Sequence, residues 1–145
     1  MGQRYEAYTL REASGNLTAG ETSPVVTGLG WADEVVVRLD VTTITTPDGD
    51  DEVDFYIETS YNQGVDWADV ENIHFDNADN GNSSVRLIVI GRPQSSAVAR
   101  AETAATLADD TKLDLPPGDR IRIQTAVTGA TAPTYAYSAE VYARG

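Results

Sequence analysis

Residues 33–69 read DEVVVRLDVTTITTPDGDDEVDFYIETSYNQGVDWAD, in which two runs of β-branched and aromatic residues flank the turn sequence Pro-Asp-Gly. In each run, every second residue is apolar, so one face of the predicted strand is apolar along most of its length. These apolar positions are Val35, Val37, Leu39, Val41, Val53, Phe55 and Ile57. Such alternation is typical of half-buried strands, and Pro followed by Asp-Gly favours a tight turn. The stretch therefore predicts two strands joined as an antiparallel hairpin, with these side chains in the core.

The rest of the chain repeats this pattern of short strands between turns. Residues 85–90 are apolar on both parities apart from Arg86, as expected of a strand buried on both sides or lying near an interface. Ile121 and Ile123 alternate with polar residues and join the predicted core. Further strands are expected at 4–12, 24–30, 67–75 with a bulge, 120–127 and 135–143. About eight strands without a clear helix predict an all-β antiparallel sandwich, in the form of an eight-stranded jelly roll.

The two ends of the chain differ in pattern. Residues 1–22 are expected to form an N-terminal arm, or an edge strand, followed by a polar loop, and residues 23–145 a single β-sandwich domain. Neither face of the first segment is clearly apolar, so Tyr5, Tyr8 and Leu10 are candidate contacts with a partner. Residues 94–107 are Ala-rich without a firm stripe and are expected to be a loop with one helical turn, or a second extended arm.

The composition limits the classes of partner. The chain has 145 residues, a net charge of −13 and no Cys. An acidic surface repels phosphate backbones and anionic lipids, so we expect neither a nucleic-acid nor a membrane partner. Without Cys there is neither a disulfide framework nor a thiolate metal site, which fits assembly in a reducing cytosol.

The titratable residues do not predict an active site. His74 is the only histidine, and a lone His predicts neither a zinc cluster nor a nucleophile–His pair, so a structural or surface role is expected. Asp54 and Glu58 share one face of a predicted strand and could be the neighbouring carboxylates of a glycosidase. Acidic alternation on a solvent face predicts the same spacing. We therefore expect no catalytic residue, no cofactor and no metal ligand, and a protein that is not an enzyme.

Two other kinds of site have partial support in the sequence. The acidic segments 48–51 and 76–80 offer oxygen ligands for Ca²⁺, but neither has EF-hand spacing, and turns in which Asp and Asn bond their own backbone are expected instead. Four aromatic residues could form a sugar-stacking platform on a sandwich, or could lie in the core or at an interface. They are Trp31, Tyr56, Tyr61 and Trp67.

Two segments carry a resemblance to a known family. The sequence Glu58-Thr59-Ser60, a short turn and then Trp67 resemble the strand and turn of small bacteriophage virion accessory proteins of the capsid decoration, or cement, type. The turn departs from the family's Asp-Gly-Gly, since residues 61–64 read Tyr-Asn-Gln-Gly. Residues 120–123 followed by 128–135 resemble the family's last hairpin. The resemblance covers roughly residues 23–145.

The resemblance implies a structural role. It implies a homotrimeric decoration protein that binds the major capsid protein on the outer head surface and bridges capsid subunits. Such a protein would be made in the cytoplasm of the host bacterium and would be located in the virion. A tail, connector or head-fibre component of the virion is the first alternative, and a carbohydrate-binding or adhesion module is the second.

Overall fold

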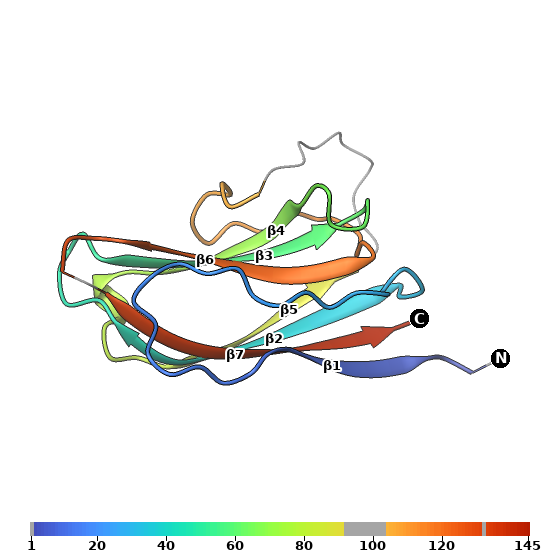
Figure 1. The fold of residues 1–145 in the computed structure, drawn as a ribbon, viewed down its shortest axis with the longest axis horizontal. Helices are drawn as coiled ribbons and strands as arrows, with labels where there is room; N and C mark the ends of the chain where they lie inside the picture. The colour runs from blue at the N-terminus through green and yellow to red at the C-terminus, as the bar shows by residue number, and fades with distance from the viewer. Residues whose placement is uncertain (1, 92–103, 132) are drawn as a thin grey trace.

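The structure is a computed structural model that describes residues 2–91, 104–131 and 133–145. Two antiparallel sheets face one another across the core, as the prediction of an all-β sandwich requires (Figure 1). The four-stranded sheet has the order β1 (Tyr5–Arg11), β7 (Thr134–Arg144), β2 (Glu34–Thr45) and β5 (Ser84–Ile90). The three-stranded sheet has the order β4 (Ala68–Phe75), β3 (Glu52–Ser60) and β6 (Arg120–Thr128). A short 3₁₀ turn, η1 (Asn77–Asp79), follows β4.

The strand predicted at residues 24–30 is present only in reduced form. Isolated bridges join Thr22 to Gln124 and Val26 to Ile121, so this segment runs beside β6 without forming a ladder. Pro24 lies between the two bridges and has no N–H to donate to a continuous ladder. Counting this segment, each sheet has four members in the order of a jelly roll, although seven strands are formed in the described ranges.

The two central strands do not form the predicted hairpin. β2 pairs with β5 and β7, whereas β3 pairs with β4 and β6, so the turn at 46–51 crosses from one sheet to the other. Thr46 fastens this crossing to the loop after β4: its Oγ1 donates to the Asp76 carbonyl at 2.7 Å, and its N–H donates to Asn80 at 2.8 Å. The last two strands, β6 and β7, also lie in different sheets, so the predicted final hairpin is wrong as well.

The predicted core is confirmed. All nine residues assigned to it are 0% exposed: Val35, Val37, Leu39, Val41, Val53, Phe55, Ile57, Ile121 and Ile123. Phe55 lies at the centre and packs edge-on against Phe75, Tyr135 and Tyr137, with ring centroids 5.7, 5.6 and 5.3 Å away. The apolar faces of the two sheets therefore meet in one continuous core.

The N-terminal segment takes the edge-strand alternative. β1 pairs with β7 along its length, and Arg4 and Gly145 exchange two backbone hydrogen bonds of 2.7 and 3.0 Å. Leu10 is 1% exposed and belongs to the core, so its assignment as a partner contact is wrong. The alternation of this segment is too weak to reveal that its last residues reach the core.

Part of the chain lies beyond what the structure covers. Of the loop or arm predicted at 94–107, residues 94–103 lie outside the described residues. No helix within the described ranges is both long and apolar enough to cross a membrane.

Candidate functional site

The outer surface of the four-stranded sheet carries a continuous set of apolar side chains. The register aligns Ala7, Tyr142, Val36 and Val89 in one row across all four strands. Leu87, which is 66% exposed, and Val85 extend this row along β5, and Tyr5 extends it along β1. We call these side chains the outer apolar face: Tyr5, Ala7, Val36, Val85, Leu87, Val89 and Tyr142.

β5 contributes three exposed residues to this face. Within the described residues it is hydrogen-bonded to a strand on one side only, β2, and therefore forms an edge of the sheet. Ile88 and Ile90 point into the core, while Val85, Leu87 and Val89 point outward and are exposed. The expectation that this strand is buried on both sides is wrong. Its alternative, a strand near an interface, stays a prediction.

The outer apolar face is hollowed where β1, β7 and β2 meet. A shallow pocket of about 450 Å³ is lined there by Tyr5, Val36 and Tyr142 among others, and an ion pair of 3.1 Å between Arg144 and Glu34 borders it. Tyr5 is thus the predicted contact residue that lies on this face. Tyr8 packs against the core instead, and its hydroxyl bonds the carboxylate of Glu6.

The outer surface of the three-stranded sheet is polar but covered. Asp54, Tyr56 and Glu58 occupy the face of β3 that was expected to meet solvent, and all three are buried. Residues 105–107 lie over this face and bond to its side chains. Residues 111–113 pair with the edge of β4, through Asn72 N–H to the Thr111 carbonyl and Leu113 N–H to the Val70 carbonyl. The alternation of β3 correctly separated its two faces, but could not show that a distant segment covers the second one.

Two acidic residues hold this covering segment in place. The carboxylate of Asp69 accepts hydrogen bonds from the backbone N–H groups of Ala105, Thr106 and Leu107 at 2.7, 2.9 and 3.0 Å. Glu58 faces Asp69 from β3, and Arg122 Nε donates to Glu58 at 2.8 Å. Burial and the hydrogen bond to Asp69 raise the pKa of Glu58 to about 7, against the opposing effect of Arg122. Both carboxylates accept a hydrogen bond from Ala105 N–H and form a buried anchor for the covering segment.

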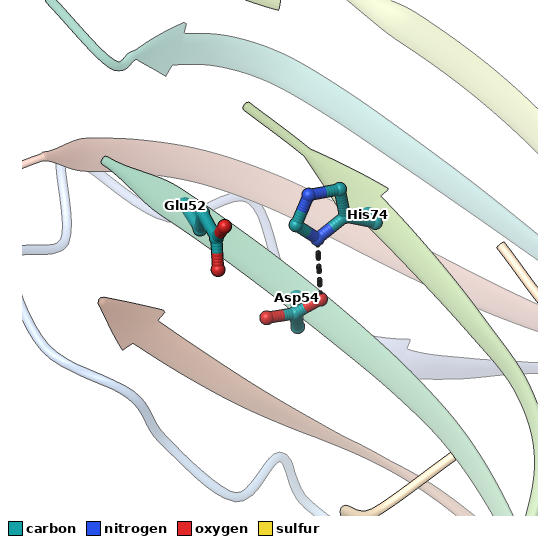
Figure 2. A group of neighbouring side chains, drawn as sticks. All are labelled: Glu52, Asp54 and His74. Carbon is teal, nitrogen blue, oxygen red and sulfur yellow. Dashed lines mark hydrogen bonds and ion pairs between the residues drawn. The ribbon is translucent and has the colours of Figure 1, made fainter. Parts of the chain in front are cut away.

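A second polar group lies further along the same face. His74 Nδ1 lies 2.7 Å from Asp54 Oδ1 and 3.5 Å from Asp109 Oδ1, and Glu52 lies beside them on β3 (Figure 2). Burial opposes a charge on the imidazole, but the hydrogen bond to Asp54 and the nearby carboxylates of Asp109 and Glu52 raise the pKa of His74. Asp54 and Glu58, predicted as neighbours, therefore belong to two separate groups.

Sequence reasoning missed the group around His74. The antiparallel register of β3 and β4 places Asp54 directly opposite His74. The sequence shows that Glu52 and Asp54 lie on the same face of one strand. It does not show where His74 lies relative to them, because that depends on a strand register with a bulge between Ile57 and Glu58.

The remaining candidate sites have local explanations. The carboxylate of Asp76 accepts from Ala78 N–H and that of Asp79 from Asp76 N–H, so the expected Asx-type turn is confirmed. The four aromatic residues do not form the sugar platform considered as an alternative, because guanidinium groups lie 4.1 Å from the centroids of both Trp31 and Trp67. Tyr56 is buried, and only Tyr61 of the four aromatic residues is exposed.

Searches with the sequence find no matching protein-family model and no matching curated protein. The two outer faces of the sandwich are therefore the features from which a function can be inferred.

Proposed function

We propose that this protein is a non-enzymatic structural component of a bacteriophage virion. In this role it is a capsid decoration, or cement, protein that binds the major capsid protein on the outer head surface and bridges neighbouring subunits. The observation that supports the proposal most is the outer apolar face of the four-stranded sheet. The major capsid protein is proposed as the partner because residues 58–67 and 120–135 resemble virion accessory proteins.

The outer apolar face has the composition of an interface. Contiguous exposed apolar patches rimmed by polar residues mark interaction sites on soluble proteins. Its neighbours on the same strands, Arg38, Asp40 and Glu140, are charged and form a polar rim. A hydrophobic centre with a polar rim is the usual anatomy of a protein–protein contact.

The energetics suit a repetitive partner. Burying one exposed Leu or Val side chain contributes about 1.5–3 kcal/mol, part of which is offset by the cost of association. One copy of this face would therefore bind with modest affinity. A homotrimer on a threefold site of the capsid would repeat the contact three times, so that the summed avidity greatly exceeds the single affinity.

A pair of matched variants tests the role of the face. Leu87→Lys places a charge at the centre of the exposed edge of β5, whereas Val65→Lys places the same charge on the loop between β3 and β4, at a residue that is 77% exposed. Purified protein is mixed with empty heads of its phage that lack it, and the heads are sedimented and analysed on a stained gel. We expect the wild type and Val65→Lys to co-sediment as a band comparable with that of the capsid protein, and Leu87→Lys to be reduced more than tenfold.

The outcomes separate the parts of the proposal. Equal binding of Leu87→Lys and the wild type would exclude the outer apolar face. A wild-type protein that binds no heads, or that is present in virions in only a few copies, would contradict decoration and favour a tail or connector location. Native mass spectrometry at micromolar concentration tests the trimer separately, and a monomer would contradict it.

A further inference from the structure

We propose that Glu52, Asp54 and His74, together with Asp109, bind a divalent transition-metal ion, and that Zn²⁺ suits the site best. The site lies on the outer face of the three-stranded sheet, away from the outer apolar face. It is independent of the proposed role in the virion.

The geometry brings three donors together from β3 and β4, and a fourth lies close to the histidine. Glu52 and Asp54 lie two residues apart on β3, and His74 faces Asp54 from β4. One nitrogen of His74 and one oxygen of each of these two carboxylates lie within 4.8 Å of one another. Atoms bound to one zinc ion at about 2.0–2.2 Å in a tetrahedron are about 3.3 Å apart, so small side-chain rotations bring the donors to ligand distance. Figure 2 shows the three side chains on one side of β3.

Asp109 supplies the fourth donor. It lies in the segment that covers the sheet, and its Oδ1 is 3.5 Å from His74 Nδ1. The next residue, Asp110, accepts a hydrogen bond from the backbone N–H of His74 at 3.2 Å, which fixes the segment against β4 at this point. A metal ion held by these four residues would therefore fasten the covering segment to both strands.

The charges of the group call for a cation. Three carboxylates lie around one imidazole; the side chains of Asp54 and His74 are each only 10% exposed, whereas that of Asp109 is 61% exposed. Among the described residues, no Lys or Arg forms an ion pair with any of the three carboxylates, and Glu52 has no hydrogen-bonding partner for its side chain. Like charges brought together in a partly buried site destabilise it unless a counter-charge is present. A divalent ion bound to the neutral imidazole offsets two of the three negative charges.

The donor types select the metal. One imidazole nitrogen and several carboxylate oxygens suit Zn²⁺ and neighbouring transition metals, whereas Ca²⁺ and Mg²⁺ prefer oxygen ligands alone. We therefore expect Zn²⁺ to bind at least tenfold more tightly than Ca²⁺ or Mg²⁺.

The single histidine makes the site directly observable. The full-length protein, labelled with ¹⁵N, is titrated with ZnCl₂ in a chelator-free buffer, and the imidazole nitrogens are recorded by NMR. Because His74 is the only histidine, every imidazole signal belongs to it. We expect a large shift of the Nδ1 or Nε2 resonance with Zn²⁺ and none with Mg²⁺. At a hundredfold excess over the dissociation constant, the melting temperature should rise by about 5–10 °C.

Two matched variants locate the site. Glu52→Gln removes a ligand that is partly exposed and should leave the fold intact, and Glu140→Gln makes the same change on the outer face of the other sheet. We expect Glu52→Gln to weaken Zn²⁺ binding at least tenfold and Glu140→Gln to leave it unchanged. An unshifted His74 resonance in the wild type at millimolar Zn²⁺ would overturn the proposal, and so would equal dissociation constants for the two variants.

Discussion

At the scale of single residues, the buried acid Glu58 links stability to pH. Its pKa is raised to about 7 from the ordinary 4.5 because it is buried and hydrogen-bonded to Asp69. A raised pKa means that the folded protein holds the proton more tightly than the unfolded chain. The stability that comes from this proton is fully present below pH 4.5 and is lost as the pH rises through about 7.

Replacing Glu58 with Gln should remove this pH dependence. Between pH 5 and pH 8, Glu58 alone should lower the free energy of unfolding of the wild type by about 2–3 kcal/mol. Glu58→Gln stays neutral and can still accept from Arg122, so its free energy of unfolding should fall less over the same range. Urea denaturation at the two pH values measures both slopes. Glu140→Gln, on an exposed residue, should follow the wild type, and a slope for Glu58→Gln equal to that of the wild type would contradict the role of Glu58.

The aromatic centre of the core is a second effect at this scale. Phe55→Ala should lower the free energy of unfolding by about 3–5 kcal/mol, because it leaves a cavity between Phe75, Tyr135 and Tyr137. Val65→Ala, at an exposed position, should change it by less than about 0.5 kcal/mol. Thermal unfolding followed by circular dichroism compares the two. An unchanged melting temperature for Phe55→Ala would mean that the core is assigned to the wrong face.

At the scale of elements, the turn before β6 is fixed by close contact with the end of β3. A Cβ on Gly118 would lie 1.9 Å from the carbonyl oxygen of Ser60, and Gly118 N–H donates to Thr59 Oγ1 at 2.8 Å. Both strands belong to the sheet that carries the proposed metal site. The turn therefore depends on a residue without a side chain.

Gly118→Ala should separate this turn from the end of β3. We expect a loss of about 2 kcal/mol or more, since the clash involves backbone atoms that cannot rotate away. Gly49, in the turn between β2 and β3, is the matched control. A Cβ there would meet no atom within 4 Å, so Gly49→Ala should change stability by less than about 1 kcal/mol. Denaturant midpoints measure both effects. Equal midpoints for the two variants would show that the backbone at the end of β3 can shift to accommodate the added methyl group.

At the scale of the whole molecule, β1 closes the four-stranded sheet and contributes Leu10 to the core. Deleting residues 1–11 should therefore unfold or strongly destabilise the domain, by at least about 3 kcal/mol, since truncating a buried Leu such as Leu10 to Ala already costs about 2–5 kcal/mol. Deleting residues 1–3, which precede β1, should leave the urea midpoint nearly unchanged. A stable fold after the longer deletion would contradict the structural role of β1 and favour the alternative that residues 1–11 form an arm.

The alternation of residues along the chain determined the strands and their buried faces. Positions such as Val37, Phe55 and Ile123 were assigned to the core because the side-chain period of a strand is two, and this period is written locally. The same rule marked the bulged strand that became β4. These strands and core positions needed no tertiary information, whereas the reduced strand at 24–30 and the burial of Leu10 did.

The tertiary structure alone decided which strands pair and what covers each face. Alternation shows which side of a strand is buried, but strands that pair side by side and strands that face each other across the core have the same pattern. Thr46 therefore begins a crossing between sheets where a hairpin was expected. For the same reason Glu58 lies under a segment distant in sequence, and His74 meets Asp54 through a register that only long-range pairing sets.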